Sequence, residues 1–570
     1  MERNPIKIFN TFGPCNPEVD YMIPSLEREP AVMPLIDKGI YFAIHAPRQS
    51  GKTTLLSSLT NKINEDGKYY PLYCSLAPTI EADSKEQASE IIFEIIIDAL
   101  KLSIAPCLNR LTGQLPEFSM KNSTALMGRL LTYICTNIDK PLVVFFDEAD
   151  SIPENATLSF LAQIRDGFNK RKIFNNNAFP KSIALVGLRD LKDYRTHDQP
   201  DNPKRLKLSP FNIQHLPLGV PNFSKDQIRA LYKQHTVASG QVFRKSSIEK
   251  VWEWTEGQPW LVNALARDII GKQLDDDYSI AVDGSHVDKA ANELIKRNEV
   301  HLSSLIDRLN EPRVRMVMAA IVSVSDVPVG SLSEDDIKYC VDLGLLKLGN
   351  DGLNDCAPAN LIYNEVIFRA LSSKLGINPK NVPENKWMDG KVLDMTGLLR
   401  AFQDFWLENA EILSKDNNND ELIDAIIEEV LSSKNHHGNI ETTTPAKKAQ
   451  IRKNVSKLIK ESLCVLVLCA FLQRVLNGGA ETVRRQHSLG SKFLDICVYY
   501  KEIPYPIEVK IKGTVTTESG IIQLLGYIGR CKTSQGWLVE FDRNPNKPSK
   551  QKLTFKTCRR GKNTVFVVGC

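Results

Sequence analysis

The sequence predicts an α/β protein with a parallel β-sheet near its beginning and a second, smaller α/β module at its end. Between residues 40 and 190 short apolar runs alternate with amphipathic helical stretches, as in a parallel sheet covered by helices on both faces. From about 210 to 375 strand signals nearly vanish. Residues 451–570 carry 21 Lys/Arg and 8 Asp/Glu, a net charge of +13, whereas the rest of the chain carries −9.

The length and composition of the chain are typical of a globular protein. A chain of 570 residues should divide into about three or four domains. With 42% hydrophobic and 25% charged residues it is neither disordered nor a membrane protein, and its most apolar run, at 463–472, indicates a buried helix. The N-terminus lacks the apolar core of a secretory signal, and the 12 cysteines form no CxxC pair. We therefore expect a cytoplasmic protein with reduced thiols and no membrane contact.

The expected elements follow in chain order. Strand-like runs occur at 39–45, 69–76, 141–150 and 182–188, with amphipathic helices such as 85–102 between them. Helices dominate from 210, and the stretch that ends near 375 fits a helix, a glycine turn and a short two-stranded wing. Residues 414–450 are polar and turn-rich, which is typical of a linker or surface insertion. The last module should contain a helix, strands near 493–500 and 505–511, a helix near 518–531 and a strand at 536–541.

The strongest local motif is AIHAPRQSGKTTLL, a strand-like run followed by a tight loop and a helix. Residues 46–53 match the phosphate-loop pattern GxxxxGK[ST], except that Ala46 replaces the first glycine. In that pattern the loop amides point at phosphate oxygens, Lys52 reaches the β- and γ-phosphates, and the Thr53 hydroxyl binds Mg²⁺. Gly51 permits the close backbone approach. The alternative interpretation is a chance GKT in an ordinary turn.

An apolar run that ends in two acids, LVVFFDEAD, follows this loop in the chain. Asp147 would hold Mg²⁺ through water, and Glu148 could polarise an attacking water as a general base. The alternative is that the two acids only cap the next helix. The loop and the acidic strand together indicate ATP hydrolysis, with ATP and Mg²⁺ as cofactors.

Two further features of this region are less specific. The strand-like run that ends in ALVGLRD would lie beside the acidic strand and bring Arg189 or Asp190 near the γ-phosphate, although a surface position for Arg189 is the alternative. In WTEGQPWLVNAL, Gly257 and Pro259 form a tight turn that opens a helix. On its own such a turn is only a helix start.

Near the end of the chain stands YPIEVKIKG, residues 505–513. In a strand, residues i and i+2 face the same side, so Glu508 and Lys510 would point together. The pair could belong to an active site or be ordinary strand-edge charge, and spacing alone does not decide. The basic tail suggests a polyanion such as nucleic acid as partner, but a solvated lysine-rich surface gives the same count.

As a set, these motifs resemble a known family. The runs FNTFGPCNPEVDYMIP, HAPRQSGKTT, FFDEAD, VGLRDLKDYR, EGQPWLVNALA and LNEPRVRMV are similar to prokaryotic AAA-like ATPases, a group related to STAND and archaeal-type ATPases. Members of this group often carry a C-terminal PD-(D/E)xK nuclease-like domain, which LCAFLQRVLNGG, LDICVYY, IEVKIKG, GIIQLLGYI and GWLVEFDR resemble. The resemblance covers most of residues 8–570 apart from about 414–450.

The resemblance implies a fold and a nucleotide site. The domains would be a P-loop parallel-sheet ATPase core at 1–209, a helical lid at 210–299, a winged helix at 300–375, a helical linker with polar insertion at 376–450 and an α/β restriction-endonuclease-like domain at 451–570. The Gly257–Pro259 turn becomes a nucleotide-sensing element between ATPase and lid. The nucleotide-binding residues would be Ala46, Pro47, Arg48, Gln49, Ser50, Gly51, Lys52, Thr53, Thr54, Asp147, Glu148, Arg189, Gly257 and Pro259.

The resemblance also implies a nuclease site in the tail. In the nuclease-like family an aspartate on one strand precedes the carboxylate-x-lysine of the next, and here Asp495 stands thirteen residues before Glu508. Two converging carboxylates bind Mg²⁺, or Mn²⁺, and Lys510 would position or help deprotonate a bound water. Glu461 would complete the metal shell, and Gln523 matches a glutamine that the family places beside the site.

We therefore expect an ATP-binding and ATP-hydrolysing switch coupled to a Mg²⁺-dependent nuclease that acts on DNA, with RNA as the second choice. A homo-oligomer is compatible with this hypothesis, and the architecture suits defence against foreign nucleic acid. The competing hypothesis is a non-cleaving, ATP-dependent regulator whose nuclease-like tail is inactive and only binds nucleic acid or protein.

Overall fold

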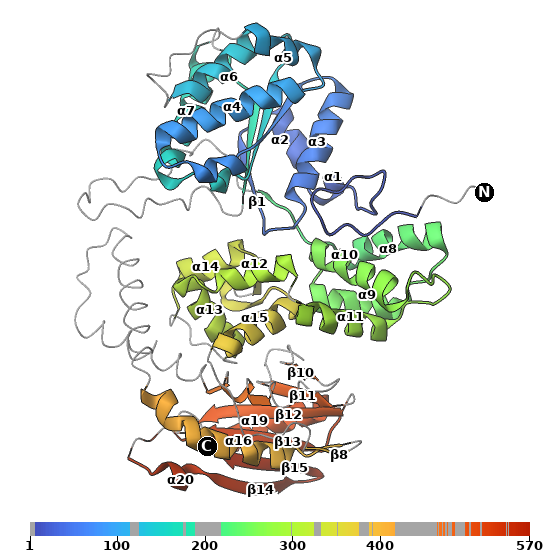
Figure 1. Ribbon diagram of the computed structural model, residues 1–570, viewed down its shortest axis with the longest axis vertical. Helices are drawn as coiled ribbons and strands as arrows, with labels where there is room; N and C mark the ends of the chain where they lie inside the picture. Colours follow the sequence, from blue (N-terminus) through green and yellow to red (C-terminus); the bar gives the residue numbers. More distant parts are fainter. Residues whose placement is uncertain are drawn as a thin grey trace. The chain divides into compact units, whose positions relative to one another are not determined.

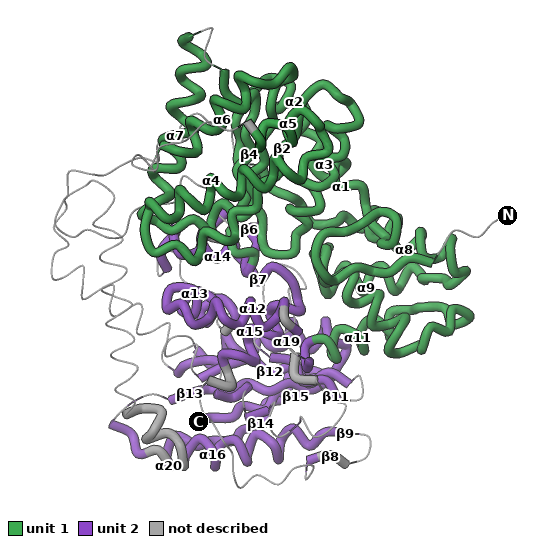
Figure 2. Tube along the Cα trace, turned by 45° about the horizontal axis from the view of Figure 1, so that its top comes forward, with its two compact units in different colours: residues 1–294, 342–344 green, residues 295–341, 345–570 purple. Residues whose placement is uncertain are grey.

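The computed structural model divides the chain into two compact units (Figure 2). One unit comprises residues 1–294 and 342–344, and the other comprises residues 295–341 and 345–570. The residues that the structure describes are 6–114, 125–174, 178–187, 218–297, 299–323, 332–349, 352–374, 387–389, 392–415, 464–465, 467–469, 471–472, 476, 482–484, 496–500, 503–512, 516–542, 544 and 546–570.

The first unit is built on a parallel sheet (Figure 1). Within the described ranges it has five strands in the order β2-β3-β4-β1-β5, and every neighbouring pair is parallel. This arrangement confirms the parallel sheet expected from the sequence, with β4 lying between the loop-bearing strand β1 and the acidic strand β3. The strands are β1 (Phe42–His45), β2 (Tyr70–Ser75), β3 (Leu142–Asp147), β4 (Ser182–Gly187) and β5 (Leu218–Gly219).

Each face of this sheet has its own apolar core. On one face α4 (Lys85–Leu102), α6 (Leu126–Thr136) and α7 (Glu154–Ile173) pack against Val144 and Phe146, and α5 (Pro106–Leu111) joins them. On the other face α2 (Val32–Asp37) and α3 (Lys52–Asp66) pack against Val143 and Phe145. Alternate residues of β3 enter opposite cores, which explains why the whole strand is apolar and buried up to its terminal aspartate.

A helical subdomain follows the sheet in the same unit. It consists of α8 (Lys225–Ser239), α9 (Lys245–Thr255), α10 (Pro259–Arg267), the π-helical turn Asp268–Gln273 and α11 (Gly284–Arg297). A capping box formed by Ser224 and Gln227 fixes the start of α8. The N-terminal segment packs on these helices, because Trp260 Nε1 donates to the Thr11 carbonyl at 2.9 Å and Gln234 Nε2 donates to the Met22 carbonyl at 2.9 Å.

The second unit begins with helices and a small hairpin. The elements are α12 (Val300–Arg308), α13 (Pro312–Ser323), α14 (Glu334–Asp342), the antiparallel strands β6 (Leu346–Gly349) and β7 (Gly352–Pro358), and α15 (Leu361–Lys374). Gly344 follows α14 with φ of 74°, a left-handed conformation that suits glycine. Helix, glycine turn and two-stranded hairpin therefore follow one another as the sequence pattern predicts.

The remainder of this unit is a mixed sheet. Its described strands have the order β10-β11-β12-β13-β15-β14, in which β12, β13 and β15 are parallel and the outer pairs are antiparallel. Helix α19 (Thr517–Arg530) makes the crossover from β12 to β13. The strands are β10 (Thr482–Arg484), β11 (Ile496–Tyr500), β12 (Ile503–Ile511), β13 (Gln535–Phe541), β14 (Thr554–Arg560) and β15 (Asn563–Gly569), and the short helix α20 (Ser549–Lys552) precedes β14.

Helices cover both faces of the mixed sheet. On one face α19 packs Ile521, Leu524 and Ile528 against Leu538, Val565 and Val567. On the other face α16 (Met395–Lys415) follows the hairpin of β8 (Met388–Asp389) and β9 (Val392–Leu393). The ring of Phe402 on α16 lies 5.3 Å from that of Phe471 and 6.1 Å from that of Phe541.

Three features of the observed fold add to the sequence prediction. Strand β5 lies within the range assigned to the lid, and its two residues are too few to show any alternation. Helix α16 packs on the C-terminal sheet although the sequence placed it in a linker. The sequence analysis predicted neither β14 nor β15. Strand β14 is exposed and basic and therefore has no apolar alternation. The described residues of the apolar run 463–472 are helical and buried, as expected.

The packing of α16 gives the first testable expectation. Because Phe402 is fully buried between Phe471 and Phe541, Phe402→Ala should destabilise the C-terminal module by about 3–5 kcal/mol. The measurement is hydrogen exchange of the β13 and β15 amides, which should become faster. Ile522→Ala, on the exposed side of α19, is the matched control and should change the free energy by less than about 0.5 kcal/mol. Equal exchange in both variants would refute the packing role of α16.

Candidate functional site

The loop between β1 and α3 has the backbone of an anion site. Gln49 and Gly51 have φ of 56° and 94°, and α3 begins directly afterwards at Lys52. The first amides of a helix have no acceptor within the helix, so those of α3 are available to a bound anion. A Cβ at Gly51 would lie 2.8 Å from Nη1 of Arg28. The left-handed conformation therefore favours glycine at this position, and a Cβ would also force the end of the Arg28 side chain to shift.

The Lys52 side chain folds back onto the backbone of the loop. Its Nζ donates to the carbonyl oxygens of Ala46 at 2.6 Å and Pro47 at 2.8 Å. Burial lowers the pKa of Lys52 to about 8, against the opposing influence of the carboxylates of Asp150 and Asp147. The ammonium group is thus held at the mouth of the loop by two carbonyls, where it could meet a phosphate oxygen.

Asp147 lies at the end of β3 and directly contacts the start of α3. Its Oδ2 accepts hydrogen bonds from the Thr53 hydroxyl at 3.0 Å and from the Tyr73 hydroxyl at 3.0 Å, and its Oδ1 accepts from the Glu148 amide at 3.0 Å. The Asp147 residue is only 2% exposed. A hydroxyl and a buried carboxylate side by side are oxygen ligands of the kind that Mg²⁺ prefers.

Glu148 leaves the strand in a left-handed conformation, with φ of 55°. This conformation is uncommon for a residue with a side chain and occurs most often at turns and functional sites. The Glu148 carboxylate is exposed and accepts a hydrogen bond from the Ser75 hydroxyl at 2.9 Å. Because β2 and β3 are parallel with Ser75 opposite Asp147, the polar ends of both strands meet at one edge of the sheet.

Two side chains that the sequence did not single out bind the loop backbone from outside. Arg28, at the end of α1 (Ser25–Arg28), is 8% exposed, and its Nη2 donates to the Ser50 carbonyl at 2.8 Å and to the Pro221 carbonyl. Burial lowers its pKa to about 10. Gln258 Nε2 donates to the Gln49 carbonyl at 3.3 Å. Arg28 belongs to no predicted site, and Gln258 lies between the predicted Gly257 and Pro259, so the tertiary structure was needed to show that both side chains bind the loop.

The Gly257–Pro259 turn faces the chain that enters the helical subdomain. Gly257 has φ of 75°, and a Cβ there would lie 1.9 Å from the Phe223 carbonyl oxygen. Pro259 occupies the first turn of α10, and the Gln258 side chain caps this helix by accepting from the Leu261 amide at 2.7 Å. The turn therefore does more than start a helix, because its middle residue also reaches the phosphate loop.

The other predicted residues of the loop lie as follows. Arg48 is exposed, Ser50 is buried, and the buried Thr54 hydroxyl accepts a hydrogen bond from the Cys15 amide at 3.1 Å. Arg189, which the sequence placed near the γ-phosphate, lies outside the described residues. Tyr73 and Ser75 were missed, although the carboxyl ends of neighbouring parallel strands are where such groups are expected to gather.

In the C-terminal module the predicted pair Glu508 and Lys510 is formed. Lys510 Nζ lies 2.6 Å from Glu508 Oε1, and Glu508 is fully buried. A Cβ at Gly520 of α19 would lie 3.4 Å from Cγ of Lys510, so this helix covers the pair. Gln523 stands one turn further along α19 and is half-buried. The two charged side chains therefore share one face of β12, as the i, i+2 spacing predicts.

Two acids of the predicted nuclease site, Glu461 and Asp495, lie outside the described residues. Ile496, which follows Asp495 in the chain, pairs with Ile507, which precedes Glu508. Within the described part of the chain, no group of three or more His, Cys, Asp or Glu side chains is placed to hold a metal ion. A nucleotide-bound Mg²⁺ does not need such a group, because phosphate oxygens and waters supply most of its ligands.

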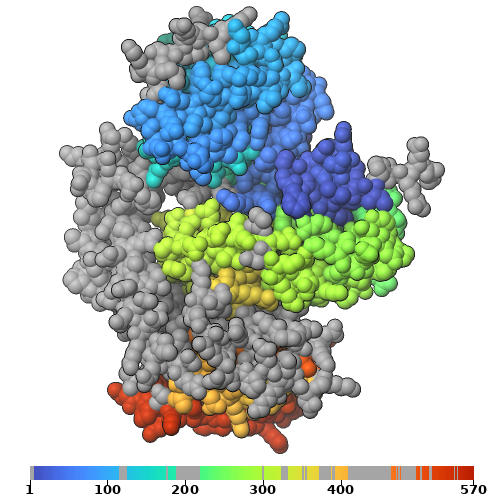
Figure 3. Space-filling model, viewed as in Figure 1, coloured from blue at the N-terminus to red at the C-terminus, as the bar shows by residue number. Residues whose placement is uncertain are grey.

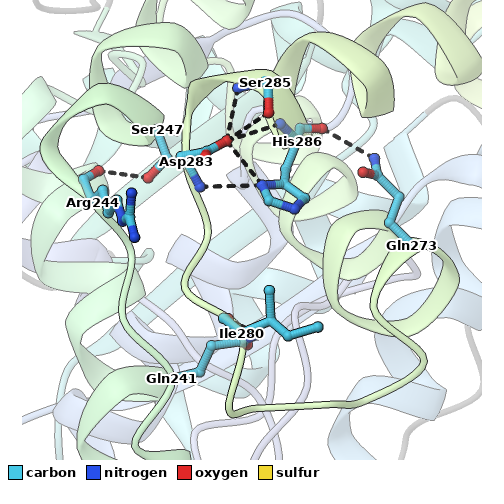
Figure 4. Close-up of polar contacts among 8 residues, drawn as sticks. All are labelled: Gln241, Arg244, Ser247, Gln273, Ile280, Asp283, Ser285 and His286. Atoms are coloured by element: carbon cyan, nitrogen blue, oxygen red, sulfur yellow. Dashed lines mark hydrogen bonds and ion pairs between the residues drawn. The ribbon is translucent and has the colours of Figure 1, made fainter.

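A Ser-His-Asp combination near α11 has a structural explanation (Figure 4). Asp283 Oδ1 accepts from the Ser285 hydroxyl at 2.7 Å, from the Ser285 amide at 3.0 Å and lies 2.9 Å from His286 Nδ1. These hydrogen bonds lower the pKa of Asp283 to about 2, the largest effect coming from Ser285. Because serine and histidine both bind the same carboxylate, the serine hydroxyl is not directed at the imidazole as a nucleophile would be. The group caps α11.

Residues 20–351 match the family described as AAA-like domain. Among solved structures, a Walker-type ATPase of Pyrococcus abyssi has 14% identity and a TM-score of 0.41, covering 63% of this chain and 99% of its own. The Orc2 protein of Aeropyrum pernix, solved with ADPNP and ADP, has 14% identity and a TM-score of 0.36 over 62% and 94% of the two chains.

A further solved structure has a similar fold to part of this chain. Cdc6p of Pyrobaculum aerophilum has 13% identity and a TM-score of 0.34, covering 63% of this chain and 97% of its own. A search of curated proteins finds no match. None of the helices in the described ranges combines the length and the apolar character that crossing a membrane requires.

The Gly257 turn can be tested against a second glycine. Gly257→Ala should destabilise the helical subdomain by roughly 3 kcal/mol or more, because the new methyl group meets the Phe223 carbonyl in addition to the strained φ. Gly240→Ala is the matched control: its φ is 85°, but nothing lies within 4 Å of a Cβ there, so about 1 kcal/mol is expected. Hydrogen exchange of the α8 and α10 amides measures both. Equal losses would contradict the close approach.

Proposed function

The chain belongs to the AAA-like domain family, and we propose that it binds and hydrolyses ATP with Mg²⁺ at the loop of residues 46–53. The observation that carries the proposal is the hydrogen bond between the Thr53 hydroxyl and the buried Asp147 carboxylate, directly beside the ammonium group of Lys52. A cationic group, free helix amides and two oxygen ligands are what a magnesium-bound triphosphate needs.

In this proposal, different residues bind the phosphates, bind Mg²⁺ and activate the attacking water. The amides at the start of α3 and the Lys52 ammonium would bind the β- and γ-phosphates. Thr53 and Asp147 would hold Mg²⁺, which neutralises phosphate charge when bound. Glu148 would orient and deprotonate the attacking water, since its carboxylate is exposed and held by Ser75 at the same edge of the sheet.

The helical subdomain would sense the nucleotide through the loop backbone. Arg28 and Gln258 bind the successive carbonyls of Ser50 and Gln49, so a shift of the loop on nucleotide binding would pull on both side chains. Arg28 also binds the Pro221 carbonyl at the entry to that subdomain. The coupling would therefore pass through two identified hydrogen bonds.

The lowered pKa of Lys52 predicts a pH dependence. In the free protein Lys52 loses its proton near pH 8, whereas bound phosphates favour the protonated form. ATP affinity should therefore be constant below about pH 7 and fall above pH 8 by up to tenfold per pH unit, with uptake of a proton on binding. Isothermal titration calorimetry in buffers of different ionisation enthalpy measures this uptake. Lys52→Arg, which stays charged throughout, should show no such uptake; the same uptake in both proteins would contradict the assignment.

We further propose that the C-terminal module is a Mg²⁺-dependent nuclease acting on DNA, controlled by the ATPase. The support is the buried Glu508 carboxylate paired with Lys510 on a central strand, beneath a crossover helix that carries Gln523. The sequence prediction supplies Asp495, thirteen residues before Glu508, as the second carboxylate. Two carboxylates would then share one cation, with Lys510 beside the water that attacks the phosphate.

The alternative is a regulator that binds nucleic acid without cutting it. Supercoiled plasmid incubated with Mg²⁺ or Mn²⁺, with and without ATP, separates the two functions. We expect nicked or linear product from the unaltered protein and at least about a hundredfold slower cutting by Glu508→Gln, because the variant loses a metal-binding charge. Asp404→Asn, an exposed acid on α16 at the other face of the sheet, is the matched control and should cut normally. Plasmid that stays intact under every condition would establish the regulator instead.

A further inference from the structure

The last part of the chain forms an exposed basic strip. From residue 543 to the end there are 8 Lys/Arg and no Asp/Glu. The strip lies on α20, on β14 and in the turn between β14 and β15, at the lower margin of the sheet in Figure 1 and among the red atoms of Figure 3. It consists of Lys550, Lys552, Lys556, Arg559, Arg560 and Lys562, which are exposed apart from the half-buried Lys552.

Little of this charge is neutralised by neighbouring carboxylates. Arg560 pairs with Glu518 of α19, with Nη2 at 3.0 Å from Oε2. In the ranges that the structure describes, Lys556, Arg559 and Lys562 form no ion pair. Like charges this close repel one another and raise the local potential, which attracts polyanions and speeds their association.

The strip is also placed in register with Glu508. Across the sheet Glu508 lies opposite Leu538, Leu538 opposite Val567, and Val567 opposite Lys556. All four belong to one row, and Cys558, two residues from Lys556, packs in the apolar cluster beneath α19. Since alternate residues share a face, Lys556 and Arg560 lie on the same face of the sheet as Glu508 and Lys510.

The separation within this row fits duplex DNA. Neighbouring strands are about 4.8 Å apart, so three steps place Lys556 about 14 Å from Glu508 along the sheet. The two backbones that border the major groove of B-DNA are separated by a groove about 12 Å wide. One backbone could therefore lie on the strip while the other approaches the Glu508–Lys510 pair, with α19, which packs on Leu538 and Val567 of this row, between the two backbones. The major groove of duplex RNA is deep and narrow, which favours DNA.

We propose that this strip binds the phosphate backbone of duplex DNA and so holds the second strand while the first lies at Glu508. The choice of DNA as substrate rests on the proposed nuclease function, which this surface deepens. The competing explanation is that lysines on an edge strand only prevent other sheets from pairing with it.

The experiment measures binding without cutting. The full chain is titrated into a fluorescein-labelled 30-base-pair DNA duplex in EDTA, and affinity is followed by anisotropy at several salt concentrations. The variant Lys556→Ala/Arg560→Ala/Lys562→Ala should bind at least about tenfold more weakly, with a salt slope smaller by about 3, because each lost phosphate contact removes about 0.9. The variant that exchanges Lys and Arg at these positions should bind nearly as the unaltered protein does, since only charge is required.

Matched controls separate the possible outcomes. Lys233→Ala/Lys245→Ala/Lys289→Ala removes three exposed cations from the helical subdomain and should leave both affinity and slope unchanged. Glu508→Gln should bind DNA without cutting it. If no protein cuts plasmid in the assay with Mg²⁺ or Mn²⁺, and only the strip variant loses DNA binding, the nuclease proposal is overturned and DNA binding by the strip is supported. Unchanged affinity and slope in the strip variant would overturn the strip, whatever the cutting activity.

Discussion

The buried carboxylate of Asp147 is the constraint on which the first unit depends. A charged group taken out of water is costly unless it is hydrogen-bonded, and here two hydroxyls and an amide satisfy it. These donors come from α3, β2 and the residue after β3, so a single side chain ties the start of α3, directly after the phosphate loop, to β2 and β3. In the proposed function, a bound Mg²⁺ would lower the cost of this buried charge further.

The loop is bound on its other side by two side chains that the sequence analysis did not name as site residues. Arg28 and Gln258 hold the carbonyls of Ser50 and Gln49, and their own positions depend on α1 and on the cap of α10. The phosphate loop is therefore a joint between sheet and helical subdomain. In the proposed function, a small movement of the loop on nucleotide binding would bias the positions of whole helices, as a switch requires.

Sequence reasoning found the parts whose chemistry is local. Strand-like runs of seven to ten residues predicted β1 to β4, the GKT loop predicted the start of α3, and i, i+2 spacing predicted that Glu508 and Lys510 share a face. It missed Arg28 and Gln258 because their partners are backbone atoms far away in the chain. It missed β14 because an exposed, basic edge strand has no apolar alternation to detect. The position of Tyr73 at the site could have been predicted, because the carboxyl ends of neighbouring parallel strands lie at one edge of the sheet.

The most direct test of the nucleotide site is the position of its metal. Crystals grown with Mn²⁺ and a non-hydrolysable ATP analogue would locate the ion by its anomalous scattering. We expect a peak between the Thr53 hydroxyl and the Asp147 carboxylate, with the triphosphate on the amides at the start of α3 and Lys52 turned toward it. A nucleotide bound elsewhere, or a metal peak remote from both side chains, would contradict the assignment of this loop as the ATP site.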